Sequence, residues 1–69
     1  MKIYTVENLA YGWHYISIIC ANSEKEAEIL SKKYNDRVEE VENYRLYTVE
    51  LDVICNSDTS KVLSNIKLY

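Results

Sequence analysis

The sequence is poor in the residues from which most small catalytic and metal sites are built. Its 69 residues include one glycine, one histidine, two cysteines, no proline and no phenylalanine. A single glycine excludes a glycine-rich phosphate-binding loop. One histidine excludes a histidine-rich metal site, and Cys20 and Cys55 are isolated, without a CxxC motif. We therefore expect no metal, no cofactor and no catalytic residue, and interpret the chain as a non-enzyme.

Long apolar runs and a strong charge of one sign are also missing. No window approaches the ~20 apolar residues of a membrane span, and the first residues lack a signal-peptide core. Eleven acidic against eight basic residues leave a net charge of −3, so direct binding to nucleic acid is not expected. We expect a cytoplasmic protein without membrane contacts, in which both cysteines are reduced, buried thiols.

What is present is enough apolar surface for one folded unit. The chain is 48% hydrophobic and 28% charged, and its length allows one core, so residues 1–69 are predicted to form a single domain. Two segments rich in β-branched and aromatic residues, 2–7 and 13–21, flank Gly12 and predict a β-hairpin. Residues 13–21 are apolar on both faces, which is typical of a central strand that is covered on both sides.

A helix is predicted over residues 24–34. Ser23 and Glu26 form a capping box, in which the Ser23 side chain accepts from the Glu26 N–H and the Glu26 carboxylate reaches back to the Ser23 backbone. Asn35 is suited to the left-handed position that follows a helix. Ile29 lies away from the predicted buried stripe, which consists of Ala27, Leu30, Ser31 and Tyr34.

The second half of the chain predicts a strand over 44–55 with one apolar face, formed by Tyr47, Val49, Leu51, Val53 and Cys55. The tail is either a short helix over 60–65 or a strand over 62–69. Residues 2–7 are echoed by 45–50, and an internal duplication would make the tail helical. We predict an α+β fold with a small antiparallel sheet of three to four strands, the helix on one face, and the order β-β-α-β followed by α or β.

The aromatic residues give the main hypothesis about function. Without phenylalanine, all eight rings, seven tyrosines and one tryptophan, have a polar tip. Tyr34 and Tyr47 are expected in the core. The others near the hairpin or at strand starts, Tyr4 and Tyr15 among them, are either binding residues or ordinary sheet aromatics. We predict a protein-binding surface, steered by the mild negative charge toward a basic partner, that contains Tyr11, Trp13, Glu7, Glu42 and Tyr44.

Two other hypotheses belong to different classes. One is an oligomer that binds a nucleotide or similar small ligand between tyrosine rings, with phosphates held by Lys32, Lys33, Arg37 and Arg45. The other is a structural homo-oligomer. Because a scaffold of this size gains little net stability from its own core, we expect self-association in any case, most simply a homodimer, through a surface that contains Ile29, Ile16 and Ile18.

In general character the chain is similar to the small proteins that phages encode to inhibit host defence systems. Such proteins are compact, acidic, glycine-poor and tyrosine-rich, and combine helix with sheet. The resemblance rests on character alone and assigns a role to no residue. It implies an inhibitor of a host protein, which is one form of the protein-binding hypothesis.

Overall fold

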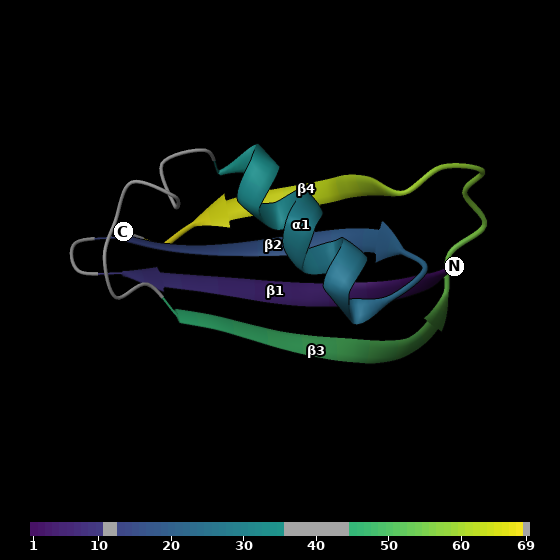
Figure 1. Cartoon of the computed structure of the whole chain (residues 1–69), viewed down its shortest axis with the longest axis horizontal. Helices are drawn as coiled ribbons and strands as arrows, with labels where there is room; N and C mark the ends of the chain where they lie inside the picture. The colour runs from purple at the N-terminus through teal and green to yellow at the C-terminus, as the bar shows by residue number, and fades with distance from the viewer. Residues whose placement is uncertain (11–12, 36–44, 69) are drawn as a thin grey trace.

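The predicted fold class is confirmed by the computed structural model, which describes residues 1–10, 13–35 and 45–68, with only the backbone at Ala10 and Trp13. The fold is α+β, with a four-stranded antiparallel sheet and one helix in the described residues (Figure 1). The elements, in chain order, are β1 (Lys2–Ala10), β2 (Trp13–Ala21), α1 (Glu24–Tyr34), β3 (Arg45–Ile54) and β4 (Lys61–Lys67).

The predicted hairpin forms the centre of the sheet. The strand order is β3-β1-β2-β4, and all neighbouring strands are antiparallel. β1 and β2 pair along their whole length, from Lys2 opposite Ala21 to Ala10 opposite Trp13. The β-branched and aromatic residues that predict these strands pack well on a pleated surface, which explains why they occupy the two central positions.

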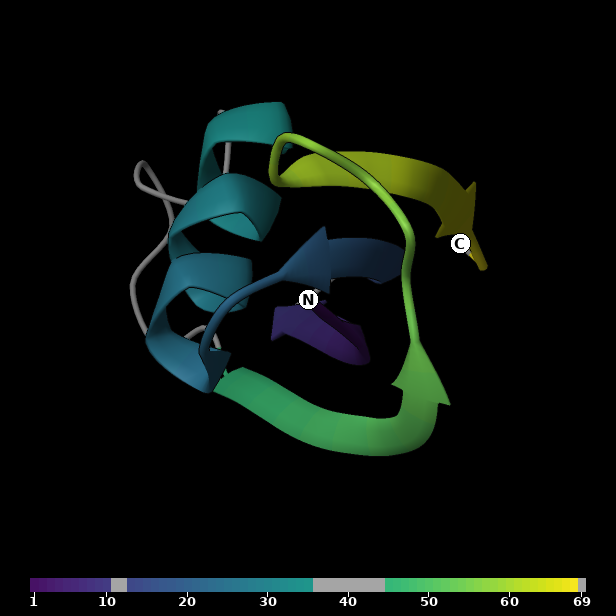
Figure 2. The ribbon, with the colours of Figure 1, turned by 90° about the vertical axis from the view of Figure 1, so that its right-hand side faces the viewer.

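Helix α1 covers one face of the sheet (Figures 1 and 2). Because side chains alternate along a strand, the central strands send every second residue toward the helix. These residues and one helical alanine form the buried core, which consists of Tyr4, Val6, Ile19, Ala21 and Ala27, with Leu30, Leu46 and Val62 packed against it. Among the described residues no helix has the length and apolarity that a membrane crossing requires.

The predicted helix start is confirmed, with one difference. The Ser23 side chain accepts from the Glu26 N–H at 3.1 Å. The Glu26 carboxylate accepts from the backbone N–H of Asn22 at 3.2 Å, one residue earlier than predicted. It also accepts from the Ser60 hydroxyl, just before β4. Glu26 therefore joins the start of the helix both to its cap residues and to the segment that leads into the last strand.

The end of the helix differs from the prediction. Ala27 and Ser31 are buried, but Tyr34 is 61% exposed, so its placement in the core was wrong. Asn35 lies beneath the last turn instead, where its side chain donates to the Ser31 carbonyl and to Asn65. Its backbone, at φ −106°, is not left-handed, since these bonds hold it in another conformation.

The tail is a strand, so the strand alternative is correct and the predicted helix is wrong. β4 pairs with β2, from Tyr15 opposite Lys67 to Cys20 opposite Lys61. The polar residues before it make a turn in place of a helix cap, because the Ser57 hydroxyl donates to the Thr59 carbonyl at 2.7 Å. The helical tail that a duplication would require is absent from the described residues.

Strand β3 turns its apolar face away from the helix. Val6 is paired with Thr48, whose hydroxyl donates to Glu28 of α1 at 2.8 Å. Thr48 and its alternating neighbours therefore face the helix, while Tyr47 faces the other side and is 49% exposed. Tyr47 is not a core residue. Tyr4, expected near a binding surface, is 5% exposed and takes the core position, because β1 is central and β3 is an edge.

Candidate functional site

The face of the sheet opposite α1, which we call the open face, is apolar across all four strands. The strand register places Thr5 between Ile18 and Val49, and pairs Ile16 with Ile66. The residues that alternate onto this face include Ile3 and Thr5 of β1, Ile16 and Ile18 of β2, Tyr47, Val49 and Leu51 of β3, and Ile66 of β4. The apolar side chains are thus contiguous and not scattered.

The edge strands carry the most accessible part of this surface. Val49 is 55% exposed and Ile66 is 47% exposed, while the central residues Ile16 and Ile18 are half-buried by their neighbours. The sequence correctly predicts that Ile16 and Ile18 lie on the opposite face from Ile19. The predicted C-terminal helix that could have covered them is the strand β4, so it extends the open face in place of covering it.

One polar pair interrupts the open face near its hairpin end. The Nε2 atom of His14 and a carboxylate oxygen of Glu7 are in hydrogen-bonding contact across β1 and β2. Both side chains are half-buried. Glu7, which the sequence assigns to the protein-binding surface, therefore lies on the open face, fixed by the only histidine of the chain.

The opposite end of the open face carries sulfur atoms. Cys20 is fully buried there, and its Sγ atom lies 3.6 Å from the Met1 Sδ atom. The Cys55 N–H donates to the Met1 carbonyl at 2.9 Å. The two cysteines are not bridged; Cys20 is buried as predicted, whereas Cys55 is only half-buried. Burial raises the pKa of the Cys20 thiol, and the neighbouring Cys55 thiol raises it further.

A second polar group, which we call the polar layer, lies buried between the sheet and the second half of α1. Its hydrogen bonds connect both central strands with the helix. Asn8 Nδ2 donates to Ser31 Oγ at 2.7 Å, and Ser31 Oγ lies 3.0 Å from Ser17 Oγ. The Asn35 and Asn65 carboxamides pair reciprocally at 3.0 and 3.1 Å, and Ser17 donates to Asn65 at 2.6 Å.

The polar layer determines how α1 sits on the sheet. Asn8, Ser17 and Ser31 are fully buried, and the Asn8 Oδ1 atom has no hydrogen-bond partner among the residues that the structure describes. Satisfied buried polar groups favour one arrangement over others, since sliding the helix would leave them unpaired. The pattern of apolar and polar residues alone does not predict this layer. The available signal was a polar residue in the apolar face of each central strand, Asn8 and Ser17.

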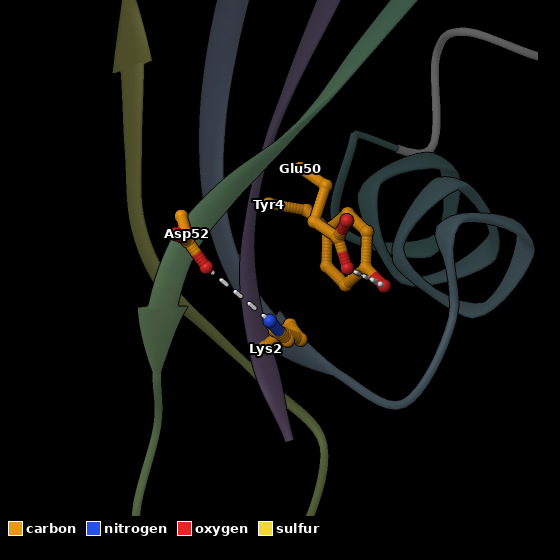
Figure 3. Close-up of polar contacts among 4 residues, drawn as sticks. All are labelled: Lys2, Tyr4, Glu50 and Asp52. Carbon is orange, nitrogen blue, oxygen red and sulfur yellow. Dashed lines mark hydrogen bonds and ion pairs between the residues drawn. The ribbon is translucent and has the colours of Figure 1, made fainter.

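At the other end of the helix-covered face, β1 and β3 make two polar contacts (Figure 3). The buried Tyr4 hydroxyl donates to Glu50 at 3.4 Å, and Lys2 lies 3.5 Å from Asp52. Burial raises the pKa of Tyr4, and the charge and hydrogen bond of Glu50 raise it further. The Lys2–Asp52 pair is solvent-exposed and contributes little to stability.

The other predicted binding residues are not gathered into one place. Lys32 and Lys33 belong to the helix layer, and Arg45 begins the edge strand β3. Ile29 is 46% exposed on the helix, so it cannot share a surface with Ile16 and Ile18. Only the backbone of Trp13 is described, and the remaining predicted residues lie outside the described part of the chain, namely Tyr11, Arg37, Glu42 and Tyr44.

Comparison with known proteins adds no assignment. No family model, curated protein or solved structure matches the chain. Within residues 1–10, 13–35 and 45–68, no three histidine, cysteine, aspartate or glutamate side chains are grouped so that they could hold a metal ion.

Proposed function

We propose that the protein is a non-catalytic protein-binding module that acts through its open face. The observation that carries this proposal is the contiguous apolar surface across β3, β1, β2 and β4, opposite the face that α1 covers. Sheets with two apolar faces are normally covered on both sides. A second protein surface would supply the missing cover.

We infer that the first occupant of this face is a second copy of the chain. The four strands are 7 to 10 residues long, which gives a face of about 500 Å² in projection at ~3.3 Å per residue and ~4.8 Å between strands. A stable interface buries about 800 Å² of accessible surface on each partner, and accessible area exceeds projected area. The open face therefore has the size that a dimer needs.

The distribution of polar groups also suits a two-fold contact. The Glu7–His14 pair lies near one end of the face, and the centre around Thr5 and Ile18 is apolar or uncharged. A two-fold axis through the centre packs the two apolar regions together and leaves the two polar pairs at opposite ends. Such isologous contacts are the commonest in homo-oligomers, and a net charge of −3 per chain opposes them only weakly.

This proposal moves the binding surface from the hairpin end, which the sequence favours, to the sheet face. Of the residues predicted from the sequence, the open face contains Glu7 from the binding surface and Ile16 and Ile18 from the oligomer surface. The inhibitor of a host protein stays a prediction, in which a different partner would occupy the face or bind the dimer. We propose a cytoplasmic location, because two cysteines suit a reducing compartment better than a disulfide-dependent secreted scaffold.

The test is the mass in solution of the full chain and three variants, measured by analytical ultracentrifugation. We expect twice the 8.1 kDa of one chain for the unmodified protein. Val49→Glu and Ile66→Glu should give monomers with an unchanged circular dichroism spectrum, because each buries a charge in the interface. Ile29→Glu is the matched control, since Ile29 is similarly exposed but lies in the helix layer, and it should remain dimeric.

Two results would overturn the proposal. A monomeric unmodified protein at high micromolar concentration would remove the second copy as occupant. Dissociation by Ile29→Glu but not by Val49→Glu would place the contact on the helix layer. A small molecule that stays bound in native mass spectrometry, together with an unchanged mass in solution for Val49→Glu, would favour the ligand-binding alternative.

A further inference from the structure

The fold brings the two cysteines, which are 35 positions apart in the sequence (20 and 55), to the same end of the open face. Lys2 of β1 pairs with Ala21 on one side and with Ile54 on the other. Cys20 precedes Ala21 in β2, and Cys55 follows Ile54, the last residue of β3. The strand β1 therefore lies between the two cysteines in the sheet. The chain after Ile54 then leaves β3 and passes the end of the sheet, on the side away from α1, on its way to β4 (Figures 1 and 2).

Met1 lies beside both cysteines. The backbone N–H of Cys55 is bonded to the Met1 carbonyl at 2.9 Å, and the Cys20 Sγ atom lies 3.6 Å from the Met1 Sδ atom. Met1 is therefore a common neighbour of both residues. After burial, the neighbouring Cys55 thiol is the next cause that raises the pKa of the Cys20 thiol. With both residues beside Met1, closure of the bridge would require the two side chains to rotate toward each other.

We propose that Cys20 and Cys55 form a redox-active pair that closes to an intramolecular disulfide and locks residues 55–60 onto the end of β2. The proposal does not depend on the dimer, because both thiols belong to one chain. It assigns a modification site to two residues that the sequence marks only as isolated buried thiols.

The chemistry has a defined order, with a low-molecular-weight disulfide such as oxidised glutathione as oxidant. Cys55 is the more accessible thiol, so its thiolate attacks one sulfur of the oxidant, whose S–S bond breaks and releases one thiol. The Cys20 thiolate then attacks the Cys55 sulfur of this mixed disulfide and releases the second thiol. In total the protein thiols lose two protons and two electrons, and the oxidant is reduced to two thiols.

The disulfide would close a loop that contains the last two residues of β2, all of α1 and all of β3. Loop closure of this length restricts the unfolded chain strongly, so the oxidised protein should be more stable than the reduced one. The bridge would also fix the segment that connects β3 to β4 at the Met1 end of the open face. Oxidation would thus stabilise the surface that we assign to binding.

The experiment is incubation of the native, reduced full chain with oxidised glutathione, followed by intact mass spectrometry. We expect a species lighter by two hydrogens, about 2 Da, and reversible by dithiothreitol. Because the chain has only two cysteines, an intramolecular bridge can join no other pair. The bridged form should melt at least about 10 °C higher than the reduced form.

Variants and a denatured control make the outcome decisive. Cys20→Ser should accumulate the mixed disulfide on Cys55, and Cys55→Ser should react much more slowly because Cys20 is buried. The same incubation in concentrated urea should give mainly mixed disulfides. A stable glutathione adduct on the native unmodified protein, disulfide-linked dimers on non-reducing gels, or equal bridging in urea would each overturn the proposal.

Discussion

Asn8 of the central strand β1 donates a hydrogen bond of 2.7 Å to the Ser31 hydroxyl of α1, and both side chains are fully buried. This bond joins the two layers of the fold at a point where water does not compete. Its net contribution is modest, but losing one partner leaves the other buried and unpaired. The polar layer therefore makes the position of the helix specific.

We predict that Ser31→Ala destabilises the protein by about 1 to 3 kcal/mol, because Asn8 then loses its partner. Adding Asn8→Leu to that variant should recover most of the loss, since both polar groups are then replaced. Urea unfolding followed by circular dichroism measures both changes. If the double variant were less stable than Ser31→Ala alone, the layer would be acting through packing and not through hydrogen bonds.

The two faces of the sheet should respond differently to loss of an isoleucine side chain. Ile19 is fully buried under α1, so Ile19→Ala should cost about 2 to 5 kcal/mol through the cavity it creates. Ile66→Ala on the open face should cost less than about 1 kcal/mol in the dissociated monomer. Urea unfolding at protein concentrations below dimer dissociation tests the pair. Equal losses would mean that the open face is part of the monomer core.

Glu26 should make the protein sensitive to acid. The hydrogen bond from Ser60, and next the N–H of Asn22, hold the pKa of its carboxyl below the ordinary value of 4.5. Because the folded state favours the charged form, this stabilisation is present above pH 4.5 and is lost as pH falls through the lowered pKa. Glu26→Gln should be less stable than the unmodified protein at neutral pH, and the gap should narrow in acid.

Urea unfolding at several pH values between about 3 and 7 measures that gap. Glu24→Gln is the control for loss of one charge in the first helical turn, since Glu24 is exposed. A gap that stays constant across this range would show that the Glu26 bonds do not depend on its charge.

Tyr4 should make the protein sensitive to alkali. Burial, and next the charge of Glu50, raise the pKa of Tyr4 above its ordinary value of 10.0. The folded state thus favours the neutral phenol (Figure 3). Its contribution is complete below pH 10.0 and is lost as pH rises through the raised pKa. Tyr4→Phe should unfold at a higher pH than the unmodified protein in an alkaline titration.

Tyrosine absorbance and circular dichroism, recorded together, follow that titration. Tyr47→Phe removes a hydroxyl from the exposed edge strand and serves as the control for the number of tyrosines. Identical alkaline midpoints for Tyr4→Phe and the unmodified protein would contradict the prediction.

The sequence predicts local structure better than it predicts which residues become neighbours. The helix limits follow from the Ser23 cap and the basic residues in its last turn, and the hairpin follows from two β-rich segments around Gly12. The tail was ambiguous because the apolar residues around Val62 fit both the spacing of a helix and the alternation of a strand. Only the pairing with β2 selects the strand.

The candidate sites depend on register, which alternation alone does not determine. The apolar face of β3 could turn to either side, and the contact of Thr48 with Glu28 shows which side the fold uses. The placement of Cys20 and Cys55 beside Met1 and the pairing of Asn35 with Asn65 likewise require knowing which strands are adjacent. Polar residues within apolar strand faces were visible, but their partners were not.

The strand order β3-β1-β2-β4 means that the chain builds its sheet from the middle outward. The hairpin β1–β2 joins residues close in sequence and pays little loop-closure entropy, whereas β4 must bring Lys61 back to Cys20. During synthesis the central hairpin and then the helix leave the ribosome before either edge exists. Each edge strand therefore has a finished template to join, and the apolar open face becomes complete only when the last strand is added.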